Sequence, residues 1–230
     1  MLLTGYHTFS PGTTSDDRIN HDYWNDVQHI DKLVHTEKLD GENNCLSRYG
    51  VFARSHAAPT TSPWTTTIRQ YWERIRHELG ELEVFLENCY AIHSLRYRKL
   101  DHHFFVFAIR EKDNWLRWEE AKFYASLLDL PTVPELLITS PPATRIQFEE
   151  GVLQLVSGRG RYDPVDKASG QPATMEGVVS RNAAGYSTGK FANNVFKWVR
   201  KGHVKTDEHW TRHWKRAPLI QEGGNHVADC

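Results

Sequence analysis

Apolar residues recur along the chain at helical intervals in some segments and at every second position in others. The helical intervals, of three and four residues, predict two helices. The first is expected to begin at Ser62-Pro63, because serine is a good N-cap and proline fits the first turn, and to stop at Gly80. The second is expected from about residue 113 to 128, before Pro131. The predicted buried positions are Ile68, Tyr71, Trp72, Ile75 and Leu79 in the first helix, and Trp118, Ala121, Ala125 and Leu128 in the second.

Shorter apolar runs bounded by turn residues predict strands. Residues 45–54 are typical of a strand, a turn at Tyr49-Gly50 and a second strand, and alternation further along places Phe105, Phe107 and Ile109 on one face. The other expected strands are 34–36, 84–87, 104–109 and 177–180, whereas 138–172 has no assignable pattern. Antiparallel hairpins combined with helices predict an α+β fold with the helices packed outside the sheets.

Composition is that of a globular domain, with 39% hydrophobic and 25% charged residues in 230. No apolar run approaches the roughly 18 residues that span a bilayer, and the N-terminus lacks a secretory pattern. We therefore expect a cytoplasmic or otherwise intracellular protein without a membrane partner, with its three cysteines reduced. The net charge is −1, yet residues 190–216 hold eight Lys or Arg against two acidic residues, which favours a local nucleic-acid surface.

The clearest chemical signal is the Lys-x-Asp-Gly motif at residues 38–41. It places a lysine, which as a neutral amine forms covalent intermediates, beside a carboxylate and a turn-forming glycine. Alone, such a motif is also found in ordinary exposed turns. Its weight comes from further segments that follow in order: Ala53-Arg54-Ser55, Leu86-Glu87-Asn88, residues 105–109, Met175-Glu176-Gly177-Val178-Val179, and residues 196–201.

With this ordered series, residues 34–203 resemble the covalent nucleotidyltransferase superfamily of ATP-dependent DNA and RNA ligases and mRNA capping enzymes. Within it, the resemblance is closest to the ATP-dependent RNA ligases. It implies an α+β, ATP-grasp-like nucleotidyltransferase (adenylation) domain of antiparallel sheets flanked by helices. We expect residues 1–230 to form this single domain, with an N-terminal extension at 1–30, a basic C-terminal tail at 202–230 and no separate C-terminal OB domain.

The resemblance also implies roles for individual residues. Lys38 would be the catalytic nucleophile that attacks the α-phosphate of ATP, Asp40 would position the lysine or a metal-bound water, and Glu176 would bind Mg²⁺ or Mn²⁺. The other implied nucleotide contacts are Glu37 to the adenine amino group, Gly41 in the motif turn, Arg54 to the ribose or phosphates, Glu87 to the ribose hydroxyls, Phe107 or alternatively Phe105 stacked on adenine, Lys197 to the α-phosphate, and Arg200.

The last segment departs from the family pattern. Many relatives carry Lys-x-Lys, whereas Val199 takes the second place here, with Arg200-Lys201 just beyond it. Basic residues past this point, Lys201, Lys205 and Arg212, are expected to contact nucleic acid. Trp210 and Trp214 either stack on single-stranded bases or dock a terminal helix on the core.

The implied function is an ATP-dependent RNA ligase that serves RNA repair. AMP passes from ATP to Lys38 and then to a 5′-phosphate end, which a 3′-hydroxyl attacks to seal the strand. The expected partner is RNA, possibly with DNA-containing ends, and the expected state is a monomer. A DNA ligase or a GTP-using capping-type enzyme is one alternative, and a nucleic-acid-binding relative without catalysis is another.

Overall fold

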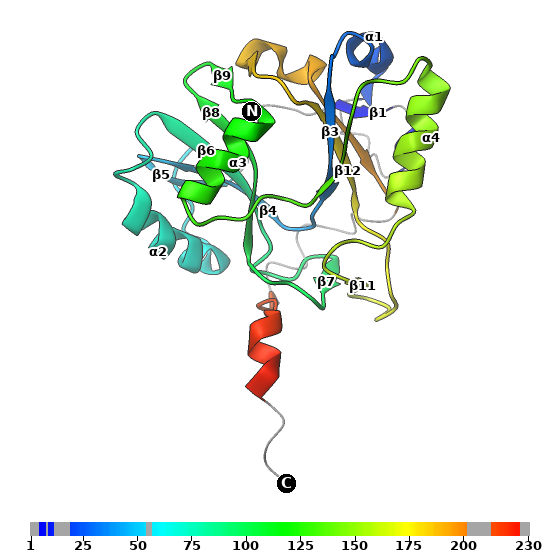
Figure 1. Ribbon diagram of the computed structural model, residues 1–230. Coiled ribbons are helices and arrows are strands. Elements are labelled where there is room, and N and C mark those ends of the chain that lie inside the picture. The colour runs from blue at the N-terminus through cyan, green and yellow to red at the C-terminus, as the bar shows by residue number, and fades with distance from the viewer. Residues whose placement is uncertain (1–4, 8, 12–18, 54–56, 202–212, 226–230) are drawn as a thin grey trace.

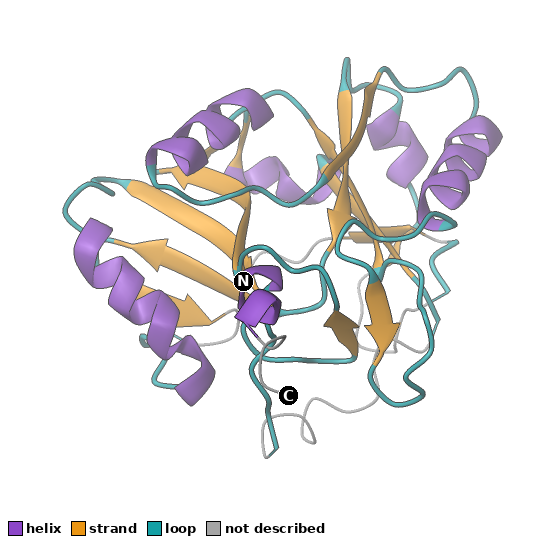
Figure 2. Ribbon diagram, turned by 60° about the horizontal axis from the view of Figure 1, so that its bottom comes forward, coloured by secondary structure: helices purple, strands orange, loops and turns teal. Residues whose placement is uncertain are grey.

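Two six-stranded sheets lie side by side, and helices cover their outer faces (Figures 1 and 2). The computed structural model describes residues 5–7, 9–11, 19–53, 57–201 and 213–225. The α+β prediction of antiparallel sheets flanked by helices is confirmed. Within the described residues, every helix is too short or too polar to cross a bilayer.

Sheet A has the strand order β10-β3-β12-β14-β1-β2. Its first four strands pair antiparallel, and β1 and β2 continue it in parallel. The bounds are β1 Gly5–His7, β2 Ile19–Asn20, β3 Leu33–Lys38, β10 Glu135–Thr139, β12 Gly177–Asn182 and β14 Val195–Val199.

Sheet B is antiparallel throughout, in the order β13-β9-β8-β6-β4-β5. The predicted hairpin is confirmed as β4 and β5, joined at the turn before Gly50. The bounds are β4 Glu42–Ser47, β5 Gly50–Ala53, β6 Leu82–Asn88, β8 Phe104–Glu111, β9 Asn114–Trp115 and β13 Tyr186–Ser187; β7 Leu95–Tyr97 and β11 Pro164–Asp166 form a separate pair.

The expectation that Phe105, Phe107 and Ile109 share one face of their strand is wrong. Phe105 pairs with Glu87 and Ala108 pairs with Phe85, so Phe107 is an extra residue at a register shift in β8. Such a bulge reverses the alternation beyond it. Phe105 therefore lies on the face of Glu87, and Ile109 lies on the opposite face.

The helices partly match the prediction. The first begins at Ser62 with a single 3₁₀ turn, η1 Pro63–Thr65, continues as α2 Thr66–Ile75, and ends well before Gly80. The second, α3 Trp118–Leu127, is shorter than expected because residues 114–115 form β9. The remaining helices are α1 Tyr23–Val27, α4 Arg145–Val156, and the 3₁₀ helices η2 Thr188–Asn193 and η3 Ile220–Asn225.

The helix α4 lies inside the segment that had no assignable pattern. Its N-cap is Thr144, whose hydroxyl accepts from the Gln147 amide at 3.3 Å, while the Gln147 side chain accepts from the Thr144 amide. This capping box is a recognisable start signal. The helix buries Phe148, Val152 and Val156 against sheet A.

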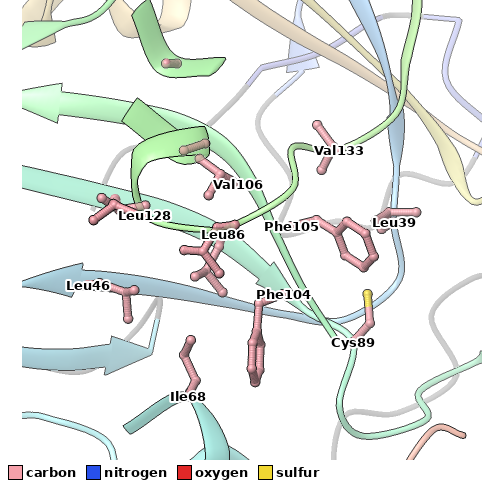
Figure 3. Close-up of a cluster of buried hydrophobic side chains, with 14 of the residues drawn as sticks. Leu39, Leu46, Ile68, Leu86, Cys89, Phe104, Phe105, Val106, Leu128 and Val133 are labelled. Carbon is pink, nitrogen blue, oxygen red and sulfur yellow. The ribbon is translucent and has the colours of Figure 1, made fainter. Parts of the chain in front are cut away.

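Two apolar clusters hold the molecule together, one on each sheet. The larger lies between sheet B and helices α2 and α3, and the smaller lies between sheet A and helices α1 and α4. Figure 3 shows that neighbouring residues of β8 diverge: Phe104 points toward Ile68 of α2, and Phe105 points toward Leu39. Leu39 thus anchors the chain where it passes from sheet A to sheet B.

Candidate active site

The Lys-x-Asp-Gly motif is the passage between the two sheets. Lys38 is the last residue of β3, and Gly41 directly precedes β4. The motif holds its shape because Leu39 is buried in the larger core, while a Cβ atom on Gly41 would lie only 2.6 Å from the carbonyl oxygen of Asn88. Only glycine fits this close approach of backbones without a local shift.

The amine of Lys38 meets the carboxylate of Glu176. The Nζ–Oε2 distance is 2.6 Å, and the Glu176 side chain is buried whereas that of Lys38 is 24% exposed. Burial by itself lowers the pKa of Lys38, but the carboxylates of Glu176, Glu87 and Asp40 outweigh it and raise that pKa above its ordinary value. Lys38 is therefore held as a cation, still reachable from solvent.

Asp40 and Glu87 fix the backbone around the lysine. The Asp40 carboxylate accepts from the Leu95 amide at 2.6 Å and the Ser94 hydroxyl at 2.7 Å, which ties the motif to β7. The Glu87 carboxylate accepts from the Gly41 amide at 3.0 Å. Both residues add negative charge around Lys38 while holding the motif loop.

Glu37 points away from Lys38, as alternation along β3 requires. Its Oε2 accepts from the Arg161 amide at 2.8 Å, and a Cβ atom on Gly160 would come within 2.4 Å of its Oε1. Burial raises the pKa of Glu37 to about 7, against the opposing effect of the Arg161 hydrogen bond. Within the described residues, Oε1 has no hydrogen-bond partner.

Lys38 and Lys197 lie on the same face of sheet A. Across β12, Lys38 is in register with Gly177, and Lys197 is in register with Val179. Gly177 has no side chain to separate the lysine from β14, and an added Cβ atom would lie 2.1 Å from the Trp198 carbonyl oxygen. The two lysines thus lie on either side of β12, on the face that Gly177 leaves without a side chain.

The residues after Lys197 explain part of the departure from Lys-x-Lys. Val199 is fully buried, and its amide and carbonyl both bond the Ser10 hydroxyl, so a cation would be poorly placed there. Arg200 is half-buried and donates its amide to the Glu176 carbonyl at 3.0 Å. Lys201 is exposed.

The two phenylalanines considered for adenine stacking differ in exposure. Phe105 is fully buried, with its ring centroid 5.0 Å from that of Tyr162. Phe107 is half-buried and lies 6.5 Å from Phe85. Because stacking needs an accessible ring face, this difference favours Phe107.

Arg181 belongs to the same region and was not predicted. It is 7% exposed, two residues beyond Val179 on the face of β12 that carries Gly177. Its guanidinium donates to the Thr36 hydroxyl at 3.0 Å and to the Phe107 carbonyl, and burial lowers its pKa to about 10. The period-two alternation of β12 was the sequence signal that could have found it.

Other predicted residues lie outside the described part of the chain: Arg54, Lys205, Arg212 and Trp210. Trp214 lies against other aromatic side chains, with its ring 6.3 Å from Trp64 and 6.0 Å from Tyr90. It is not in a helix, so the alternative of a docked terminal helix is wrong at this residue, and stacking on single-stranded bases stays a prediction.

The acidic residues fit a magnesium-like ion that keeps most of its waters. Among the described residues, no group of three or more His, Cys, Asp or Glu side chains could enclose a metal. Mg²⁺ is commonly held by one or two carboxylates together with substrate phosphates. Glu176, buried and facing Lys38, is a suitable carboxylate for this mode.

Comparisons with known proteins agree on the family. The family model for RNA ligases matches residues 31–199, whereas no curated protein sequence matches. A mutant of the Naegleria gruberi RNA ligase solved with ATP and Mn aligns with a TM-score of 0.55 and 18% identity, covering 87% of this chain and 60% of that one. The same ligase with PPi aligns at 0.54 and 18% identity, covering 93% of this chain and 60% of that one.

A more distant structure shares the fold as well. An archaeal ATP-dependent RNA ligase aligns with a TM-score of 0.50 and 15% identity, covering 85% of this chain and 48% of that one. The chain therefore spans about 60% or less of the length of these ligases. Because the family model covers most of the chain, the protein belongs to the RNA ligase family.

Proposed function

We propose that the protein is an ATP-dependent RNA ligase that carries AMP on Lys38, transfers it to a 5′-phosphate end and joins that end to a 3′-hydroxyl. The observation that supports this most strongly is the 2.6 Å contact between a partly exposed Lys38 and a buried Glu176, at the passage between the two sheets. Family membership supports the same reaction class.

In the first step, the Lys38 Nζ atom forms a bond to the α-phosphorus of ATP while the bond from that phosphorus to the departing pyrophosphate breaks. Attack requires the neutral amine, so the proton on Lys38 must leave first. The surrounding carboxylates oppose this in the free protein. A divalent cation bound at Glu176 would offset their charge and that of the triphosphate.

The remaining residues bind and orient. Lys197, on the same face as Lys38, is placed to stabilise charge on the α-phosphate during in-line displacement. Phe107 supplies a half-exposed ring for the base, and Arg181 holds the Phe107 carbonyl and Thr36 in place. Glu87, on the facing sheet, accepts from the ribose hydroxyls.

The test is intact-mass analysis after incubation with ATP and Mg²⁺, using protein shown to be free of bound AMP. We expect one added AMP in the wild type and none in Lys38→Ala. The protein that carries AMP should then seal 5′-phosphorylated RNA without further ATP. Failure to form the adduct with ATP would overturn the proposal.

The alternatives give distinct outcomes in the same assay. An adduct formed only from GTP would indicate a capping-type enzyme, and efficient sealing of DNA but not RNA 3′-hydroxyl ends would indicate a DNA ligase. RNA binding without any nucleotide adduct would indicate a binding protein.

A further inference from the structure

Three aromatic side chains meet at one end of sheet B. Trp64 of η1, Tyr90 after β6 and Trp214 near the C-terminus are all half-buried. The Trp214 ring lies 6.3 Å from Trp64 and 6.0 Å from Tyr90, between centroids. We call these three residues the aromatic cluster.

Hydrogen bonds fix the cluster to β4, the strand that follows the lysine motif, and to the end of β6. Trp64 donates its indole N–H to Glu42 at 3.1 Å, and the Tyr90 amide donates to the Asn88 side chain at 3.0 Å. The C-terminal segment is held by bonds from the Ile92 amide to the Lys215 carbonyl and from the Ala217 amide to the Tyr90 carbonyl. The aromatic rings are therefore preorganised, which reduces the entropy lost on binding.

A cavity of about 470 Å³ lies next to the cluster. Its lining contains one arginine and two histidines, and the described lining has no carboxylate. The lining residues are Thr67, Gln70, Tyr71, Arg74, His102, His103, Phe104 and Leu219. The His103 ring connects the two features, since it lies 4.9 Å from the Tyr90 ring and donates to the Ala217 carbonyl.

The strand register places both features at the end of the sheet that carries the lysine motif. Glu42, Asn88 and Phe104 are in register across β4, β6 and β8. Two strand spacings separate Glu42 from Phe104, about 10 Å. Glu42 follows Gly41 directly, so this row begins one residue from the motif, on the face opposite Glu87.

We propose that the aromatic cluster and the adjoining cavity bind a single-stranded RNA segment, with bases against Trp64 and Trp214 and a phosphate beside Arg74. The proposal rests on the ligase function and names the surface that would hold its substrate. Aromatic rings beside cations suit single strands, because bases stack while phosphates pair with the charges. Lys215 is exposed beside the cluster, while Arg216 lies over the Tyr90 ring and pairs with Glu222.

The experiment is fluorescence anisotropy with a labelled, 5′-phosphorylated single-stranded oligoribonucleotide, measured without ATP. Trp214→Ala and Arg74→Glu should each weaken binding at least tenfold, and Trp214→Phe should recover most of the loss. Arg74→Gln should also reduce the slope of log affinity against log salt by about one.

Two matched controls lie elsewhere on the same sheet. Tyr49→Ala removes an exposed ring from the β4–β5 turn, and Lys112→Glu reverses an exposed charge at the far end of β8. Both should bind RNA as the wild type does. Urea unfolding of every variant establishes that the fold is intact.

The outcomes separate this proposal from the proposed function. If Trp214→Ala and Arg74→Glu bind RNA within twofold of the wild type, the surface is wrong even when lysyl-AMP forms. If these two variants lose RNA binding while the wild type forms no lysyl-AMP, the RNA-binding surface is supported and the ligase function is overturned. Tighter binding of the matching DNA oligonucleotide would overturn the assignment to RNA.

Discussion

The two faces of β6 lead to buried regions of opposite character. On the outer face, Leu86 packs with Ile68 and Val106 in a cluster where all three are fully buried and apolar. The other face carries Glu87 toward the lysine motif, where Glu176 is 2% exposed and Lys197 is 6% exposed. Similar burial thus accompanies apolar side chains in one region and charged side chains in the other.

The contrast indicates what each region is for. Apolar burial stabilises the fold by roughly 25 cal/mol per Å² removed from water. Burying charges costs free energy that pairing only partly offsets. The outer cluster therefore supports stability, whereas the buried charges near Lys38 lower it, a cost that is consistent with the proposed nucleotide site.

The largest expected effect comes from removing the nucleophile. Lys38→Ala should abolish lysyl-AMP completely, because it removes the amine that forms the bond to AMP in the proposed reaction. Its folded structure should persist, since the Lys38 side chain is 24% exposed. Mass analysis and urea unfolding of one preparation test both statements, and an adduct that remains on the variant would contradict the assignment.

A pair of substitutions should separate stability from activity across the two faces. Ile68→Ala should lower the free energy of unfolding by about 3 to 4 kcal/mol, because it empties a fully buried site, yet retain lysyl-AMP formation in the cold. Glu176→Gln should lower the free energy of unfolding by less than Ile68→Ala does, because the amide keeps the shape of the buried side chain, and it should abolish the adduct.

Urea unfolding and intact mass are the measurements for this pair. Equal loss of stability in both variants would remove the distinction between a supporting face and a functional one. Val152→Ala is a matched control in the smaller core and should behave as Ile68→Ala does.

Replacing glycine by alanine near the site and far from it should change the free energy of unfolding in opposite directions. Gly177→Ala should lower the free energy of unfolding by about 3 kcal/mol, since the new Cβ atom would meet the Trp198 carbonyl oxygen at 2.1 Å. Gly151→Ala, in α4 with open space around it, should raise it by about 0.5 to 1 kcal/mol. A neutral result at Gly177 would show that β14 can shift.

Much of the outer face was readable from the sequence, because apolar periodicity reports burial directly. The spacing of Ile68 and the residues after it predicted α2, and the hairpin followed from the run around Gly50. The bulge at Phe107 was not predictable, since it is set by pairing with β6 rather than by local pattern. The helix α4 was missed because its start signal is a capping box of polar residues, which a search for apolar spacing does not detect.

Around Lys38, the motif series named residues that the structure does bring together, including Glu87 and Glu176. The motif series could not predict which way each side chain points. Glu37 is adjacent to Lys38 in sequence yet faces Arg161, because alternation sends neighbours to opposite sides of a strand. Arg181 was missed because its contacts, with Thr36 on the neighbouring strand and with the Phe107 carbonyl of the other sheet, join segments that are far apart in the sequence.

The last prediction concerns Glu37 and the pH dependence of stability. Burial raises its pKa from 4.5 to about 7, so between these values the folded protein binds a proton that the unfolded chain has lost. The stability that Glu37 contributes is therefore complete below about pH 4.5, falls as the pH rises, and is lost above about pH 7. The total change should be about 3 to 4 kcal/mol, at roughly 1.4 kcal/mol per pH unit.

Glutamine does not ionise, so comparing the wild type with Glu37→Gln isolates the titration of Glu37. The difference in unfolding free energy between wild type and variant should fall steadily from pH 4.5 to 7 and stay constant above that range. His35, whose pKa burial lowers to about 4, makes stability rise with pH over part of the same window, but it is present in both proteins and cancels. Glu150→Gln, at an exposed position on α4, should track the wild type throughout. If the Glu37→Gln profile also runs parallel to the wild type, the carboxylate ionises in the folded protein as it does in the unfolded chain, and its burial does not raise its pKa.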